Sequence, residues 1–251
     1  MRLLNLGCGI HYHLDWINVD LRLTGPGVLP YNLLGRALPF RSNVFDAVYH
    51  SHVLEHFPKH YAPIFLRECF RVIKPGGVIR VAVPDLERIA QLYLELLARA
   101  LQGDTEAQQR YEWIILELFD QMVRNYSGGE MVEYWKKNPM PAEDFVIERL
   151  GSEVLAALAA VRSAAPETTA RLEISADPVP IGQFRLAGEI HQWMYDRYSL
   201  GALLTAAGFS HPRVCRANES AIAGFNTYLL DIEPSGAVRK PDSLFMEAEK
   251  S

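Results

Sequence analysis

Four short, almost uninterrupted apolar runs within the first 85 residues constrain the fold more than any other feature of the sequence. The runs are Leu3–Leu6, Ile17–Val19, Phe45–His50 and Val78–Val83. Strands buried on both faces of a parallel sheet have this composition. Between the last two runs, an amphipathic pattern predicts a helix from Ala62 to Ile73, which "KPGG" (74–77) ends. These segments predict an α/β fold with a doubly wound, mostly parallel sheet.

The middle of the chain has a different pattern. Helical periodicity is seen in three stretches after residue 86, and a proline-dotted, extended segment follows from Pro166 to Pro180. Between residues 103 and 153, 11 acidic residues stand against 5 basic ones. We therefore expect residues 86–186 to form a mainly helical insertion or cap after the fifth core strand.

Sheet-type patterning returns near the C-terminus. Asp196 is placed to cap a helix with Gly208 at its end, and "PRVCRA" (212–217) and "NTYLLDI" (226–232) predict two closing strands. The residues after 235 are polar and predict a loose tail. The expected organisation is a core at 1–85 and 187–235, the insertion at 86–186, and the tail at 236–251.

Composition narrows the function classes. The net charge is −5, and no Lys/Arg-rich run offers a footprint for nucleic acid. No apolar stretch is long enough to span a membrane, and the N-terminal apolar run is too short for a secretory signal. The three cysteines, Cys8, Cys69 and Cys215, are widely spaced, which indicates a reducing compartment. We expect a cytoplasmic protein that binds neither nucleic acid nor membrane, with a homodimer left open.

A glycine loop follows the first predicted strand. Gly7 and Gly9 let the backbone turn sharply and approach a ligand, and Asp20, at the end of the second strand, can accept hydrogen bonds from both hydroxyls of a ribose. A dinucleotide fingerprint needs a third glycine where Tyr12 stands and a full helix facing the pyrophosphate. Only seven residues separate Gly9 from the next strand. A nucleoside ligand without phosphates, such as S-adenosylmethionine (SAM), fits better.

The pentapeptide His52-Val53-Leu54-Glu55-His56 raises an alternative. It matches H-x-x-E-H, in which two histidines hold zinc and the glutamate activates water. A zinc helix needs two stable turns, and Pro58 follows too closely. A zinc-dependent hydrolase using His52, Glu55 and His56 is kept as an alternative, beside a nicotinamide oxidoreductase and a non-catalytic SAM-fold binding protein.

The motifs taken together resemble a known family. "LNLGCG", "WINVDL", "LPF", "FDAVYHSHVLEHF" and "ECFRVIKPGGVIRVAVPD", in this order, are similar to class I SAM-dependent methyltransferases, and "HQWMYDRYSLGALLTAAGF" is similar to their late helix. More narrowly, the chain resembles a bacterial, type 11-like branch with a shortened first helix. The resemblance covers about residues 1–90 and 187–232. It implies a seven-stranded Rossmann-like sheet and SAM as the cofactor.

The same resemblance implies the cofactor contacts. Gly7, Cys8 and Gly9 would pass under the methionine part of SAM, and Asp20 would hold the ribose. Asn5 stands where the family usually has an acid, and His11 stands at the frequent third glycine. The full set of expected cofactor residues is Asn5, Gly7, Cys8, Gly9, Asp20, Asn32, Leu38, Ser51 and His52, with Asn32 and Leu38 beside the adenine and the last two beside the sulfonium.

Three histidines are candidates for catalysis. His52 and His56 are suited to act as a base on an acceptor hydroxyl, and His191 could close the substrate site from the other side. Each has a structural alternative: His52 could pack against the cofactor with one nitrogen bonded to backbone, His56 could be a core residue, and His191 could be a contact between the insertion and the core. The predicted function is methyl transfer to a small-molecule or carbohydrate-like acceptor at oxygen, with no metal.

Overall fold

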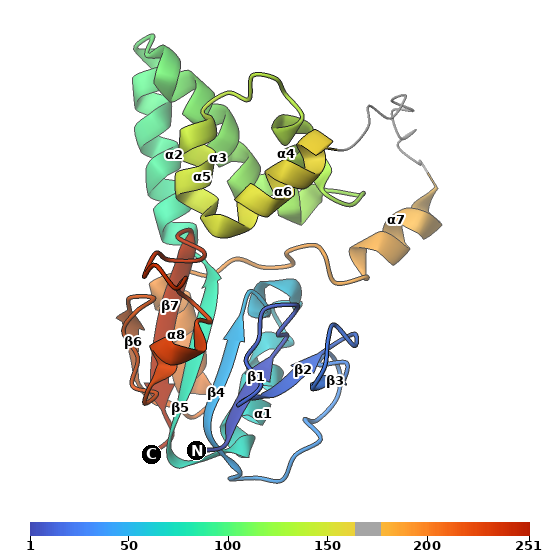
Figure 1. Cartoon of the computed structure of the whole chain (residues 1–251), viewed down its shortest axis with the longest axis vertical. Helices are drawn as coiled ribbons and strands as arrows, with labels where there is room; N and C mark the ends of the chain where they lie inside the picture. Colours follow the sequence, from blue (N-terminus) through green and yellow to red (C-terminus); the bar gives the residue numbers. More distant parts are fainter. Residues whose placement is uncertain (164–176) are drawn as a thin grey trace. The chain divides into compact units, whose positions relative to one another are not determined.

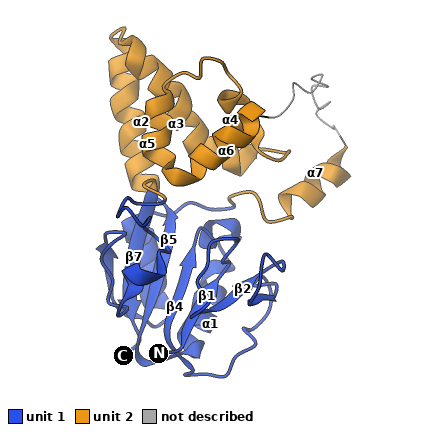
Figure 2. Ribbon diagram, in the orientation of Figure 1, with its two compact units in different colours: residues 1–85, 192–239, 243–251 blue, residues 86–191, 240–242 orange. Residues whose placement is uncertain are grey.

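The computed structural model describes residues 1–163 and 177–251 and divides into two compact units. The sheet unit comprises residues 1–85, 192–239 and 243–251, and the helical unit comprises residues 86–191 and 240–242 (Figure 2). Most of the segment predicted to be extended after Pro166 lies outside the described residues. Its last part, from Pro178, belongs to a helix instead.

The sheet unit is built on seven strands in the order β3-β2-β1-β4-β5-β7-β6 (Figure 1). β1 to β5 run parallel, and β7 runs antiparallel to both β5 and β6. The predicted mostly parallel, seven-stranded α/β sheet is confirmed. The strands are β1 (Leu3–Leu6), β2 (Ile17–Asp20), β3 (Val28–Pro30), β4 (Phe45–Ser51), β5 (Ile73–Pro84), β6 (Ser210–Cys215) and β7 (Ser243–Glu249).

Strand order fixes where a ligand can bind. Along the chain the sheet grows from β1 outward to β3 and then resumes on the other side of β1 with β4. The connections leave β1 and β4 in opposite directions, so a crevice opens between their carboxyl ends. The residues that follow Leu6 and Ser51 therefore line the expected ligand site of this sheet.

Two helices cover one face of the sheet. α1 (Ala62–Val72) buries Phe65, Leu66 and Cys69, and α8 (Arg197–Ala206) buries Leu200 and Leu204, against strand residues of the main core. α8 begins with the predicted cap: the Asp196 carboxylate accepts the Ser199 N–H at 2.7 Å, and the Ser199 hydroxyl completes a capping box.

A loop covers the opposite face, with no helix between β1 and β2. Trp16, Phe225 and Leu230 pack on strand residues that include Tyr49. The predicted strand at 226–232 is therefore wrong: the segment forms the 3₁₀ helix η2 (Phe225–Tyr228) and a turn. Its apolar side chains are used to cover the sheet face, which leaves none of the period-2 alternation that an added strand needs.

The tail is also different from the prediction. Residues 243–249 form β7, a strand inside the sheet, so the prediction of a loose tail at 236–251 is wrong. Leu244 and Met246 join the main core on one side, and Phe245 is buried on the other. A strand with neighbours on both edges and cover on both faces is stabilised by burial despite its polar flanks.

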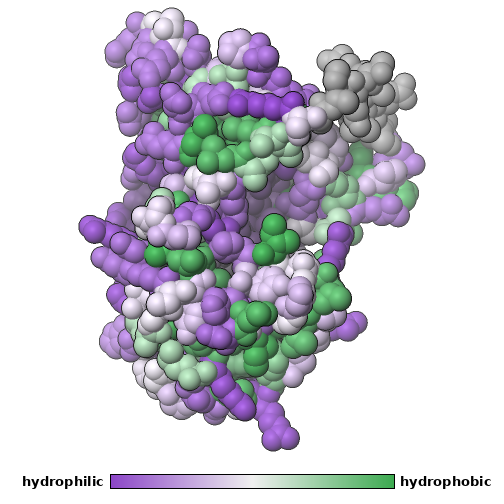
Figure 3. Space-filling model, viewed as in Figure 1, coloured by the Kyte–Doolittle hydropathy of each residue, from purple (hydrophilic) through white to green (hydrophobic). Residues whose placement is uncertain are grey.

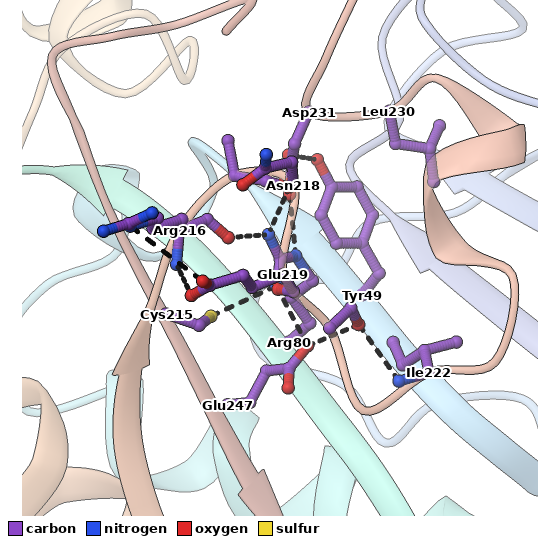
Figure 4. A network of polar contacts seen from close by, with 12 residues as sticks. Tyr49, Arg80, Cys215, Arg216, Asn218, Glu219, Ile222, Leu230, Asp231 and Glu247 are labelled. Atoms are coloured by element: carbon purple, nitrogen blue, oxygen red, sulfur yellow. Dashed lines mark hydrogen bonds and ion pairs between the residues drawn. The ribbon is translucent and has the colours of Figure 1, made fainter. Parts of the chain in front are cut away.

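Arg80, in β5, organises the loop-covered face (Figure 4). Its guanidinium is fully buried and binds Asp231 at 2.7 Å and Glu247 at 2.9 Å. It also donates to the carbonyls of Arg216, Ala217 and Glu219. The loop from 216 to 231 is thereby tied to the sheet by a buried cation whose donors have partners.

The helical unit contains α2 (Leu86–Leu101), α3 (Thr105–Val123), α4 (Gly129–Trp135), α5 (Glu143–Leu150), α6 (Ser152–Ser163) and α7 (Pro178–Arg185). α2 and α3 pack as an antiparallel pair (Figure 1). The Arg149 guanidinium binds the buried carboxylate of Glu117 at 2.7 Å, and burial still raises the pKa of that carboxyl. In the described residues, no helix of the chain has the length and apolarity that crossing a membrane requires.

Candidate functional site at the carboxyl ends of β1 and β4

The glycine loop packs directly against the segment that follows β4. Gly7 has a φ of +67°, and its N–H donates to the Val19 carbonyl at 2.7 Å. A Cβ at Gly7 would lie 2.2 Å from Cγ2 of Val53. Both the left-handed backbone and the close approach require glycine here. The loop after β1 is thus brought beside residues 52 and 53, at the predicted crevice.

Asp20 and Gly9 form the rim of the crevice at β2. The Gly9 N–H donates to Oδ2 of Asp20 at 2.8 Å, and the Arg22 N–H donates to Oδ1 at 3.3 Å. A carboxylate has about four acceptor positions, so two more donors can be received. Gly9 has a φ of +57°, and a Cβ there would meet nothing within 4 Å. An open glycine backbone beside a partly exposed acid fits the ribose of a nucleoside.

Cys8 lies between the two glycines and is buried. Burial, with a smaller contribution from Asp20, raises the pKa of its thiol to about 11. The thiol is therefore neutral near pH 7, where it is a poor nucleophile. Its role in the loop is to fill space, while the backbone on either side turns.

The chain after Gly9 does not form a dinucleotide site. Residues 10–16 make turns with no helix, so no helix N-terminus faces the glycine loop. Pyrophosphate binding in the dinucleotide fold relies on that terminus. Instead, the His11 ring lies 2.7 Å from the Leu229 carbonyl and fixes this connection to the loop that covers the sheet. The geometry suits a nucleoside without phosphates.

The remaining expected cofactor residues are spread more widely. The Asn5 amide is buried and donates to Asn18 at 3.2 Å, so it is engaged inside the sheet. Leu38 belongs to the main core. Asn32 is exposed, and its side-chain oxygen accepts the Leu34 N–H at 2.9 Å. Ser51 is hydrogen-bonded to the buried phenol of Tyr49.

His52 follows β4 with an unusual backbone. Its φ is +53°, a left-handed value uncommon for a residue with a side chain, and its N–H donates to the Ala82 carbonyl at 2.9 Å. Its Nε2 lies 2.8 Å from the Ser243 hydroxyl, and its Nδ1 lies 3.2 Å from Oε1 of Glu55. Nε2 thus faces a hydroxyl, and Nδ1 faces a carboxylate.

The zinc helix of the H-x-x-E-H alternative does not form. Residues 54–56 make a single 3₁₀ turn, and His52 lies outside it in the left-handed conformation. His52 and His56 therefore do not share a helix face, and the Nδ1 of His52 is directed at Glu55. The zinc-hydrolase interpretation loses the geometry on which it depended.

Three buried polar residues lie in or near this turn: Glu55, His50 and Tyr195. Glu55 is fully buried, and its backbone carbonyl accepts the N–H groups of Gln192 and Trp193. His50 is fully buried with neither ring nitrogen hydrogen-bonded, and burial lowers its pKa to about 4. The buried Tyr195 hydroxyl has no hydrogen-bond partner either, and burial followed by the charge of Glu55 raises its pKa.

The other two candidate histidines are assigned to different units of the chain. His56 ends the 3₁₀ turn in the sheet unit, and its N–H donates to the Val53 carbonyl. His191 is the last residue of the helical unit before the chain re-enters the sheet unit, and its N–H donates to the Gln121 carbonyl at 2.9 Å. The structure brings Gly7, Gly9 and Asp20 to the same sheet edge as His52.

Sequence reasoning missed Ser243 entirely. The residue opens β7, and β7 was hidden in a segment predicted to be loose. The signal available was the run "SLFMEAE", which contains the short apolar stretch Leu244–Met246. Tyr195 carried a weaker signal, as a tyrosine just before the helix cap at Asp196.

A family model agrees with this geometry. Residues 4–81 match the family described as "Methyltransferase domain". The match begins in β1, passes through the glycine loop, Asp20 and His52, and ends in β5. No curated protein sequence matches the chain.

Solved structures are more distant. A SAM-dependent methyltransferase from Archaeoglobus fulgidus is 11% identical, with 99% of this chain and 86% of that chain covered and a TM-score of 0.43. A possible histamine N-methyltransferase from Thermotoga maritima is 12% identical, with 100% and 82% covered and a TM-score of 0.42. Likeness at this level says nothing about the acceptor.

The matched residues and the observed sheet indicate the class of protein that this chain resembles. Within the sheet unit, residues 4–81 are similar to methyltransferase domains, and SAM is the cofactor. Its glycine loop, open on one side, and the free acceptor capacity of Asp20 fit that cofactor.

Proposed function

We propose that the chain transfers a methyl group from SAM to a small-molecule or carbohydrate-like acceptor, at oxygen. The observation that carries the proposal is the close approach of Gly7 and Val53. It puts the loop expected to hold the cofactor beside His52, whose Nε2 lies 2.8 Å from a hydroxyl.

Cofactor binding would use the loop and the rim. Gly7, Cys8 and Gly9 would pass under the methionine part, and the Asp20 carboxylate would accept the ribose hydroxyls. Leu21, next to Asp20 and 51% exposed, offers an apolar surface for the adenine. Hydrophobic side chains gather on the surface around β2 and β3 (Figure 3), where Leu23 and Leu29 are exposed as well. Adenine would cover part of this surface.

When bound, SAM supplies a methyl group on a positively charged sulfur that leaves as a neutral thioether. The chain's own task is to hold the acceptor oxygen in line at about 3 Å and to keep water away. Nε2 of His52 would accept the proton of the acceptor hydroxyl as the oxygen forms its new bond to carbon. The proton would thus end on His52, and the electron pair of the broken sulfur–methyl bond would remain on the sulfur.

The acceptor class is proposed from charge. The excess of acidic residues between 103 and 153 disfavours nucleic acid and other polyanions near the helical unit. A neutral hydroxyl compound carries no such penalty. A small or sugar-like acceptor therefore fits the chain better than a nucleic acid does.

Calorimetric titration of the full chain with SAM, S-adenosylhomocysteine and NADH tests the proposal. We expect the first two to bind and NADH not to bind. Asp20→Ala should weaken SAM binding roughly 10- to 100-fold, because two hydrogen bonds to a charged group are lost. Asp15→Ala, an exposed acid in the same region, is the matched control and should leave the affinity unchanged.

Three results would count against this assignment. Absence of heat with both SAM and its demethylated product would favour a non-catalytic module. Preferential binding of NADH would restore the oxidoreductase alternative. An unchanged SAM affinity in Asp20→Ala would move the ribose away from β2.

A further inference from the structure

We propose that Glu55 is a positioning residue for His52: it holds the proton on Nδ1 and so leaves the lone pair of Nε2 directed at a hydroxyl. The role belongs to the proposed methyl-transfer site and rests on that function. The observation behind it is a chain of three side chains at the end of β4: Glu55 and His52, which are three positions apart, and Ser243, which lies far along the sequence.

The protonation pattern follows from the chemistry of the partners. The Nδ1 of His52 lies 3.2 Å from Oε1 of Glu55, an electrostatic contact without the geometry of a hydrogen bond. The negative charge of an ionised Glu55 at this distance favours the tautomer with its proton on Nδ1. In a neutral imidazole the other nitrogen then has only a lone pair. The Ser243 hydroxyl, 2.8 Å away, must donate to it. Ser243 thus occupies the position that the hydroxyl of an acceptor needs with respect to a base.

Glu55 is held rigidly enough to direct the ring. Glu55 is fully buried in the 3₁₀ turn. Its backbone carbonyl accepts hydrogen bonds from the N–H groups of Gln192 at 2.7 Å and Trp193 at 3.2 Å. A buried carboxylate is costly unless cationic or donor groups face it. His50, His52, His56 and Tyr195 are titratable groups close to this carboxylate within the sheet unit.

The backbone of His52 gives independent support. A non-glycine residue in the left-handed region is strained, and such residues concentrate at functional sites. The conformation turns the ring away from the continuation of β4, while the N–H remains bonded to Ala82. The strain has a use if the ring must lie between Glu55 and Ser243.

Nitrogen-15 NMR of the histidine rings tests the positioning role in the protein without cofactor. At a pH where His52 is neutral, we expect the proton on Nδ1 and a lone pair on Nε2. Glu55→Leu, which keeps the volume and removes the acceptor, should shift the proton to Nε2. Ser243→Ala should leave it on Nδ1. Asp15→Ala, which removes an exposed acid beside His13, should change only the His13 signals.

A proton found on Nε2 in the wild-type protein would overturn the proposal, and so would an unaltered tautomer in Glu55→Leu. Should Glu55→Leu fail to fold, the wild-type tautomer and the Ser243→Ala spectrum decide alone. The outcome is separable from the proposed function, since SAM titration does not depend on the tautomer. Bound SAM with the wrong tautomer removes the positioning role only, while the right tautomer without SAM binding removes the methyltransferase site.

Discussion

Two buried polar groups of the sheet unit are treated differently by the fold. The Arg80 network (Tyr49, Arg80, Asp231 and Glu247) has its guanidinium donors paired with carboxylates and carbonyls. The Glu55 group (His50, His52, Glu55 and Tyr195) contains a histidine and a tyrosine whose polar atoms lack hydrogen bonds. Apart from His52, which is partly exposed, the residues of both groups are buried.

The difference separates two uses of buried polarity. A satisfied network holds elements together, and here it ties the loop at 216–231 to β5 and β7. Unsatisfied buried groups lower stability and persist where a function needs them. The Glu55 group lies at the sheet edge where strand order predicts a ligand. The Arg80 network does not lie at that edge.

Removing the cation of the satisfied network should have the largest effect. Arg80→Met leaves Asp231 and Glu247 buried without their cation, and we expect a loss of about 3–5 kcal/mol in the free energy of unfolding. Urea denaturation measures it. Arg213→Met is the matched control, because Arg213 also binds Glu247 but is half exposed, and it should cost less than about 1 kcal/mol. Equal losses in the two variants would show that the network is not the anchor.

His50 in the unsatisfied group should make stability depend on pH. Burial lowers its pKa from 6.5 to about 4, so between these values the unfolded chain binds a proton that the native chain does not. The free energy of unfolding is therefore unaffected by this group above pH 6.5 and decreases as the pH falls toward 4. The decrease amounts to about 2 kcal/mol at pH 5.

His50→Leu should abolish that dependence. The variant's stability relative to wild type should rise by about 2 kcal/mol between pH 8 and pH 5 in urea denaturation. His60→Gln, at an exposed site, should change stability equally at both pH values. A constant difference for His50→Leu would mean that the ring is already protonated or hydrated in the native state.

Two tyrosines provide the closest comparison of the groups. The Tyr49 hydroxyl donates to Asp231 at 2.6 Å, whereas the Tyr195 hydroxyl has no hydrogen-bond partner. Tyr49→Phe should cost about 1–3 kcal/mol, because a buried carboxylate oxygen loses its donor. Tyr195→Phe should be nearly neutral or slightly stabilising. Thermal and urea unfolding measure both, and a larger loss in Tyr195→Phe would reverse the comparison.

Local pattern explains which parts of this molecule were predictable. The strand Leu3–Leu6 and the glycine loop follow from a few adjacent residues, and Asp196 caps α8 as expected. β7 could not be predicted in this way. Its short apolar run is flanked by polar residues, and the burial of both its faces depends on the rest of the sheet. The loop at 226–232 was wrongly predicted to be a strand, because its apolar residues pack on the face of the sheet and do not belong to an added strand.

The candidate site was predictable to the same limited extent. Gly7, Asp20 and His52 lie in short motifs whose chemistry can be read locally. Ser243 lies 191 positions from His52 along the chain, so only the fold brings them together. Glu55 was visible in the pentapeptide, and Pro58 argued against a metal-binding helix there. Its contact with His52 was not predictable, because it depends on the left-handed backbone at position 52.

A crystal structure of the chain with S-adenosylhomocysteine tests the central claim most directly, because it locates the cofactor on the sheet. The account predicts the ribose hydroxyls on the Asp20 carboxylate, the amino-acid part over Gly7–Gly9, and the sulfur on the side of His52. A nucleoside bound away from the carboxyl ends of β1 and β4, or a ribose held by residues other than Asp20, would contradict it.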